Sequence, residues 1–209
     1  MPRPRVHDLD RALDAAEELA VGAGSAAVTI RALSDATSMS NGALYHAFGS
    51  RAGLLGRAWV RAAERFLQLQ RDAVDYALES GNHAVDEATA VEAVVAAALC
   101  PAVFHDQSPT SAQFLLTVSR AELLRSGEVP EDVAKDLRHL DKALASIFVQ
   151  LSRSLWDRKD KAAVAVIRDC VVGLPTALLL RGNRTADPAA RERLAAAVRA
   201  VLSIPPAGN

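Results

Sequence analysis

Aromatic residues and cysteine are scarce in this chain of 209 residues, and neither positive nor negative charge is in excess. Phe, Trp and Tyr together make up 4 %, so alanine, leucine and valine have to build any core. A composition with few dense β-branched runs favours helices. Half of the residues are apolar and 23 % are charged, which is typical of a packed globular protein rather than a disordered chain. The sequence therefore predicts an all-α fold.

Cys100 and Cys170 are the only cysteines, and they form no CxxC pattern. Without a recognisable signal peptide, this usage predicts a cytoplasmic, reduced protein with two buried thiols. Long hydrophobic runs are also lacking, since a membrane span needs about 18 apolar residues. The longest runs, 93–104 and 171–180, are each interrupted by proline. We therefore expect no membrane partner and no metal or other cofactor.

The net charge of −1 gives no bulk signal for nucleic-acid binding. The first 65 residues contain eight arginines and seven acidic residues, so that part is also nearly neutral. A basic tail at residues 2–5 either reaches toward DNA or is simply frayed. Any DNA-binding role must therefore rest on a motif and on the positions of individual arginines.

One stretch in the first quarter of the chain reads as two short helices joined by a tight turn. In the first helix Ile30 and Leu33 recur at helical spacing, and Thr29 is placed to cap its start. The turn falls at Ser38 and Met39. Met39 supplies the apolar side chain that two crossing helices need between them.

The second helix of this stretch presents a polar face. Ser40 is placed to cap the helix by accepting a hydrogen bond from an amide near its third residue, and Leu44 and Phe48 point inward one turn apart. A short helix that carries small and polar side chains outward fits the major groove of DNA. The outward positions are Asn41, Ala43, Tyr45 and His46.

This pattern resembles the TetR family of bacterial transcriptional regulators. The matching residues are Thr29, Ile30, Arg31, Ser40, Gly42, Leu44, Tyr45, Phe48, Ser50, Arg51, Leu54 and Leu55. The rest of the chain agrees with the family in length and helical pattern. The resemblance implies a helix-turn-helix DNA-binding domain of three helices at residues 1–49. It also implies a larger helical ligand-binding and dimerisation domain at residues 50–209.

The resemblance further implies a homodimeric regulator, a repressor that binds a palindromic operator and is released by a small, mostly hydrophobic molecule. The expected contacts to double-stranded DNA are Thr29, Arg31, Ser38, Ser40, Asn41, Ala43, Tyr45, His46 and Arg51. The family usually has glycine where this chain has Ser38, so a left-handed backbone there would carry strain.

The remaining helices are expected near residues 8–21, 50–79, 83–99, 108–126, 130–157, 161–180 and 189–202, with Pro101 in a turn. By the resemblance, the ligand pocket would include Phe66, Gln70, Phe104, His105, Phe114, Val118, Leu144 and Phe148. The dimer interface would use Val164, Ile167, Val171, Leu174, Leu178, Leu194, Val198 and Val201. For each pocket residue taken alone, a place in the plain core is the simpler interpretation.

Two other functional classes compete with a regulator. An enzyme built on a helical bundle would show paired Glu-x-x-His motifs, a glycine-rich phosphate loop or a nucleophile elbow, and none appears. We therefore predict no catalytic or metal-binding residue. A second alternative remains open, a helical interaction protein whose helix-turn-helix domain (the head) is vestigial and no longer binds DNA. The head is nearly neutral, and it has Ser38 where the family usually has the turn glycine.

Overall fold

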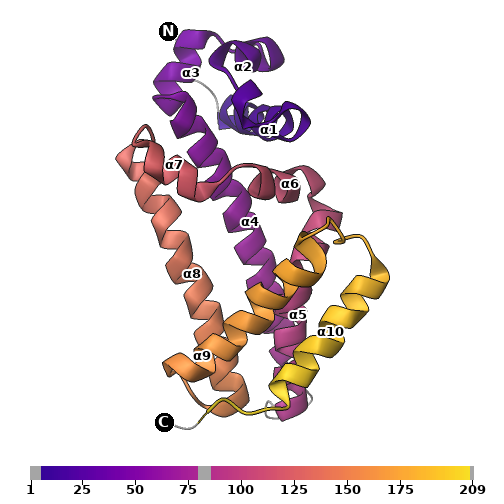
Figure 1. Cartoon of the computed structure of the whole chain (residues 1–209). Coiled ribbons are helices and arrows are strands. Elements are labelled where there is room, and N and C mark those ends of the chain that lie inside the picture. Colours follow the sequence, from indigo (N-terminus) through magenta and orange to yellow (C-terminus); the bar gives the residue numbers. More distant parts are fainter. Residues whose placement is uncertain (1–5, 80–85, 208–209) are drawn as a thin grey trace. The chain divides into compact units, whose positions relative to one another are not determined.

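The computed structural model describes residues 6–79 and 86–207, and in these ranges the regular elements are all helical (Figure 1). This confirms the all-α fold class. The predicted basic tail at residues 2–5 and the predicted helix start at residue 83 lie outside the described residues. The elements are α1 (Val6–Ala23), η1 (Ser25–Ala27), α2 (Ile30–Thr37), α3 (Asn41–Phe48), α4 (Arg51–Glu79), α5 (Glu87–Gln107), α6 (Pro109–Thr117), α7 (Arg120–Ser126), α8 (Glu131–Trp156), α9 (Lys161–Arg168), η2 (Asp169–Gly173), η3 (Thr176–Leu180) and α10 (Pro188–Leu202).

The chain divides into two compact units, and α4 and α8 each run from one unit into the other. The first unit ends at Glu64 and resumes with Ser108–Asp141. The second unit contains Arg65–Gln107 and the chain from Lys142 onward. The expected functional boundary after residue 49 stays a prediction, because compactness divides the chain at other positions.

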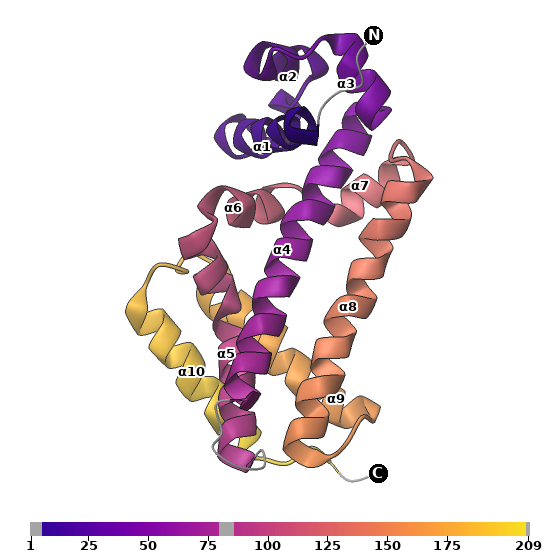
Figure 2. The ribbon, with the colours of Figure 1, turned by 180° about the vertical axis from the view of Figure 1, so that it is seen from behind.

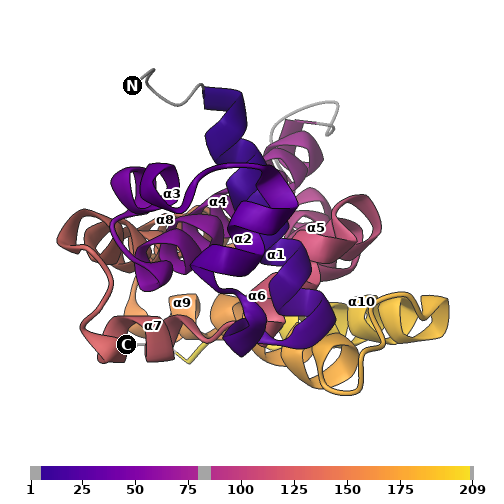
Figure 3. The same ribbon diagram turned by 90° about the horizontal axis from the view of Figure 1, so that it is seen from above.

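Small side chains let the helices of the first unit pack closely around one core. Along α1, Ala12, Ala16 and Ala20 are fully buried at the spacing of one helix face. They share the core with Leu33 of α2 and Leu44 of α3, both also fully buried. Figure 3 shows α1, α2 and α3 lying together in this unit. Burying each leucine contributes about 1.5–3 kcal/mol.

The two long helices begin and end close to their predicted positions. Ser50 caps α4, because its Oγ accepts a hydrogen bond from the Gly53 amide at 2.9 Å. The same hydroxyl donates to the Glu128 carbonyl at 3.1 Å, which joins the start of α4 to the loop before α8. Along α8, the apolar side chains of Val133, Leu137 and Ile147 are at most 1 % exposed.

Pro101 lies inside α5, which corrects the prediction of a helix that ends before it and a turn around it. Proline has no amide hydrogen, so the Ala97 carbonyl one turn earlier loses its helical donor. The buried side chain of Gln70 replaces that donor, since its Nε2 donates to the Ala97 carbonyl at 3.0 Å. The helix therefore continues through the proline with its backbone acceptor satisfied.

The segment predicted as one helix over 108–126 is two helices, α6 and α7, which is a second correction. The chain is extended at Val118, whose carbonyl accepts a hydrogen bond from Trp59 Nε1 at 3.0 Å. Ser119 then caps α7 by accepting from the Glu122 amide. Ser108 precedes α6 but makes no such side-chain hydrogen bond.

The C-terminal helices are held by arginine–carboxylate pairs. Asp160 caps α9 through two backbone amides, and the Arg158 guanidinium beside it lowers the pKa of that carboxyl to about 2. α10 lies beside α5, as Figure 2 also shows. Two bidentate pairs join these helices, Arg191 with Asp106 and Arg199 with Glu92. On both sides of Pro175 the backbone forms π-helical turns.

Both cysteines are buried, as the sequence predicts. Burial raises the pKa of the Cys100 and Cys170 thiols to about 12, so both stay protonated and unreactive at neutral pH. Two helical segments, Glu87–Gln107 and Lys161–Leu180, are long and apolar enough to span a bilayer by length and composition. Half of the first segment's apolar window is buried inside the protein, as expected of a core helix.

Candidate nucleic-acid interface

Local hydrogen bonds fix the geometry of α2, the turn and α3. The Thr29 hydroxyl accepts from the Ala32 amide at 3.1 Å, and the Ser40 hydroxyl accepts from the Ala43 amide at 3.2 Å. These two caps are the ones the sequence predicts, and each satisfies an amide that the helix leaves unpaired. Across the turn, Ser34 Oγ donates to the Met39 carbonyl at 2.7 Å. Met39 packs against the core of the unit, as expected.

The outer face of α3 is polar and open to solvent. Asn41 and His46 are exposed, and Tyr45 has 54 % of its surface accessible. Leu44 and Phe48 are buried, so the inward and outward faces agree with the prediction. Ala43 is half-buried, and its small side chain lets another molecule approach the helix backbone. Asparagine and tyrosine side chains in this position have donors and acceptors for base edges and phosphates.

Thr29, Arg31 and Ser40 lie at or near the starts of α2 and α3, and all three are exposed. Arg31 has no ion-pair partner among the residues that the structure describes, so its charge is available to an anion. Hydroxyls and backbone amides at helix starts, together with an arginine, are the groups that bind DNA phosphates. Apart from the half-buried Ala43, the predicted residues are therefore exposed to solvent, with one exception.

The exception is Arg51. Its guanidinium donates to the carbonyls of Val28 and Ser25, which close the loop between α1 and α2. The side chain is half-buried, and its donors are directed at the protein's own backbone. The structure thus gives Arg51 a role in positioning α2, whereas its predicted phosphate contact has no support from these contacts.

Ser38 adopts the left-handed conformation, with φ at 59° and ψ at 16°. A residue with a β-carbon is strained in this region, whereas glycine is not. We therefore expect Ser38→Gly to raise the free energy of unfolding by up to about 1 kcal/mol, which a urea titration measures. Ser38 is exposed, so a loss of stability on this change would show that its left-handed backbone is not strained.

A buried carboxylate anchors α1 beneath the helix-turn-helix. Glu17 of α1 is 3 % exposed. Its Oε1 accepts from Arg61 Nη2 of α4 at 2.7 Å, and its Oε2 accepts from Ser111 Oγ of α6 at 2.6 Å. Burial lowers the pKa of the Arg61 guanidinium, but the hydrogen bonds and charges of Glu17 and Asp14 outweigh it and raise the pKa.

Sequence reasoning missed this anchor. Glu17 lies next to an alanine-rich face of α1, and a charged residue at such a position is expected to be exposed to solvent. Its partners are 44 and 94 positions away along the chain, so no local spacing links them. The only available signal was a carboxylate adjacent to the apolar stripe of a helix.

The eight predicted ligand-pocket residues are divided between the two units. Phe114 and Val118 belong to the core of the first unit. In the second unit, Phe66 and Phe104 stack edge to face with ring centroids 5.6 Å apart. Gln70 is committed to the α5 backbone through Nε2, while its buried Oε1 has no partner among the described residues. The other members are Phe148, which is buried, Leu144, which is half-buried, and His105, with 29 % of its side chain exposed.

Four of the eight predicted dimer residues are part of the protomer's own core, which corrects their assignment to an exposed surface. Ile167, Val171, Leu194 and Val198 are at most 3 % exposed within the single chain. The other four, Val164, Leu174, Leu178 and Val201, are half-buried. The sequence could not separate these groups, because both faces of the helices carry apolar residues.

The comparison with known protein families matches the part of the chain that contains the helix-turn-helix. Residues 12–58 match the model of the family described as bacterial regulatory proteins, tetR family. This range covers α2, the turn and α3 in full, with the first turns of α4 and most of α1. No curated protein sequence matches the chain significantly.

Solved structures share the fold over nearly the whole chain. The TetR family transcriptional regulator PfmR from Thermus thermophilus is 20 % identical, with a TM-score of 0.63 over 93 % of this chain and 98 % of that one. A protein from Pseudomonas aeruginosa PAO1 assigned as a transcriptional regulator is 14 % identical, with a TM-score of 0.72 over 96 % and 91 %. At such identities the similarity establishes the fold alone.

The same fold also occurs in a protein with a different role. The superantigen PfiT is 19 % identical to this chain, with a TM-score of 0.67 over 95 % of this chain and 96 % of that one. Fold similarity therefore does not establish function, and an assignment of function has to rest on the residues of the helix-turn-helix. Residues 12–58 therefore carry the similarity to the tetR family of bacterial regulatory proteins that the sequence motif indicates.

Proposed function

We propose that the chain is a cytoplasmic transcriptional repressor that binds a palindromic DNA operator as a homodimer and is released by a small, mostly hydrophobic molecule. The observation that supports this most directly is the doubly capped α2–α3 pair, which presents Asn41 and Tyr45 to solvent while Leu44 and Phe48 fix the helix from below. A rigid helix with a polar outer face is suited to reading base edges in the major groove.

In this proposal Asn41, Tyr45 and His46 face the bases, and Ala43 contacts a thymine methyl group. Ser38 also faces the bases, while Thr29, Arg31 and Ser40 hold the adjoining phosphates. Arg51 acts by positioning α2. Each good base contact contributes about 1–3 kcal/mol of discrimination. Because the net charge of the head is close to zero, selectivity rests on these few side chains.

Dimerisation supplies the second half-site that a palindrome requires. The apolar surface left for it on the C-terminal helices includes Val172, which is 40 % exposed, with the half-buried Leu174, Leu178 and Val201. A ligand in the second unit would act by favouring a spacing of the two heads that does not fit DNA. A tenfold loss of operator affinity needs about 1.4 kcal/mol of coupling.

The test is selection of genomic DNA fragments by the purified protein at low and moderate salt, beside the double variant Asn41→Ala/Tyr45→Ala. Both side chains are exposed, so the variant is expected to keep the fold and serves as a matched control for DNA reading. Enrichment of a palindrome by the natural protein alone supports the proposal. Absence of any enriched fragment at either salt would favour an interaction protein with a vestigial head.

A further inference from the structure

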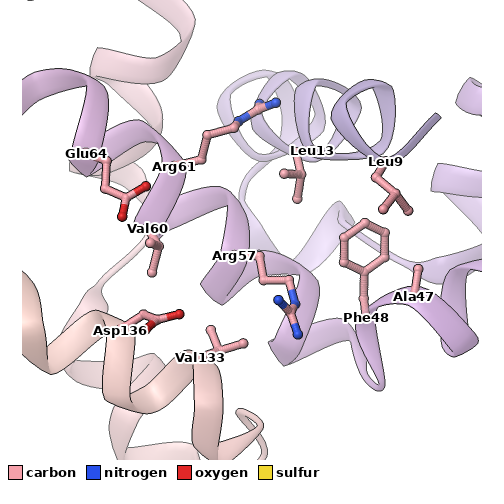
Figure 4. Close-up of a pocket in the computed structure, with 10 residues that line it drawn as sticks. All are labelled: Leu9, Leu13, Ala47, Phe48, Arg57, Val60, Arg61, Glu64, Val133 and Asp136. Carbon is pink, nitrogen blue, oxygen red and sulfur yellow. The ribbon is translucent and has the colours of Figure 1, made fainter. Parts of the chain in front are cut away.

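A hollow of about 320 Å³ lies in the first unit (Figure 4). Its floor is apolar and is formed by α1, the end of α3, α4 and α8. The apolar lining residues are Leu9, Leu13, Ala47, Phe48, Val60 and Val133. A volume of this size is sufficient for a small organic molecule.

Two carboxylates lie at one side of the hollow and have no hydrogen-bond or ion-pair partner among the described residues. Glu64 comes from α4 and Asp136 from α8, and Figure 4 shows them on either side of Val60. Both are exposed, and neither has a hydrogen bond or ion pair within the described part of the chain. The carboxylates of Asp132, Asp14 and Glu17, by contrast, are already paired with the arginines of the lining.

The two arginines of the lining do not oppose a cation. Arg57 donates to Asp132 at 2.8 Å, and Arg61 is surrounded by Asp10, Asp14 and Glu17. Their Nε atoms are buried without acceptors among the described residues, but their charges are balanced or exceeded by these carboxylates. The local charge is therefore negative, which disfavours an anion and favours a cation.

We propose that this hollow binds a lipophilic cation, a molecule with one positively charged head and an apolar body. The head would lie between Glu64 and Asp136, and the apolar body would cover Val60, Leu9 and Leu13. The proposal does not depend on DNA binding, since it uses only the hollow and its charges.

Three probes of similar size test the charge requirement: 4-phenylbutylamine, 4-phenylbutanol and 4-phenylbutyrate, titrated calorimetrically into the full chain. We expect the amine to bind about tenfold more tightly than the alcohol, from two partly solvated ion pairs, and the carboxylate to bind most weakly. Equal affinity for the three probes, or no binding of the amine at millimolar concentration, would overturn the proposal.

Variants then locate the site. Glu64→Gln/Asp136→Asn should reduce amine affinity about tenfold, to the level of the alcohol, without changing the affinity for the alcohol. Glu192→Gln on α10 is the control for loss of an exposed acidic charge elsewhere and should leave amine binding unchanged. If the double variant keeps the amine affinity, or Glu192→Gln reduces it equally, the cation is not bound in this hollow.

Discussion

Replacing Glu17 by alanine is expected to lower the free energy of unfolding by about 3 kcal/mol, because it breaks a buried charged network. The carboxylate is 3 % exposed and joins three helices, with Arg61 of α4 at 2.7 Å and Ser111 of α6 at 2.6 Å. Without it, the Ser111 hydroxyl loses its acceptor. Arg61, whose side chain is only 14 % exposed, loses its buried counter-charge. Urea unfolding followed by circular dichroism measures the change.

Asp14→Ala is the matched control for Glu17→Ala. Asp14 accepts from the same Arg61 nitrogen at 2.6 Å, but its side chain is 56 % exposed. An ion pair of this kind contributes about 1 kcal/mol or less. We expect a clearly larger loss of unfolding free energy for Glu17→Ala than for Asp14→Ala. Equal losses would mean that the burial of Glu17 adds nothing to its contribution.

The second large effect concerns Gln70, whose replacement by leucine we expect to cost about 2 kcal/mol. The side chain is 1 % exposed, and its Nε2 is the donor for the Ala97 carbonyl that Pro101 leaves without an amide. Leucine fills the space but leaves a buried backbone acceptor unpaired. The exposed Gln68→Leu on the same helix is the control and should change stability by less than about 0.5 kcal/mol.

A double-mutant cycle distinguishes this explanation from simple loss of packing. In a Pro101→Ala background, the new amide of residue 101 can donate to the Ala97 carbonyl within α5. The cost of Gln70→Leu should then fall by at least half, giving a coupling of about 1 kcal/mol between the two positions. Additive effects of the two substitutions would contradict the pairing of Gln70 with the proline.

Local chemistry was sufficient to predict the helix-turn-helix. Thr29, Ser40 and Ser50 lie directly before apolar periodic segments, and each caps the helix that follows. The inward positions of Leu44 and Phe48 follow from the helical period alone. In this part of the chain the fold and the candidate site could be predicted because each signal lies within four residues of its effect.

The wrong predictions arose where a distant residue changed the local outcome. Gln70 lets α5 continue through Pro101, and Trp59 holds the Val118 carbonyl where one predicted helix becomes two. Arg51, whose phosphate contact stays a prediction, likewise donates to the carbonyls of Val28 and Ser25. None of these donors is near its acceptor in sequence, so propensity and spacing could not reveal them.

Measuring how affinity for the enriched DNA fragment depends on salt shows most directly whether the exposed face of α3 and its surroundings bind DNA. We expect the affinity to fall linearly with salt concentration on a log–log scale, because binding releases counterions from the phosphates. Arg31→Ala should make that slope shallower by about one, as expected for a phosphate contact. Asn41→Ala should keep the slope and lose about 1–3 kcal/mol, as expected for a base contact. Affinity that does not change with salt, or a slope that is the same with and without Arg31, would contradict DNA binding by this face of α3 and its surroundings.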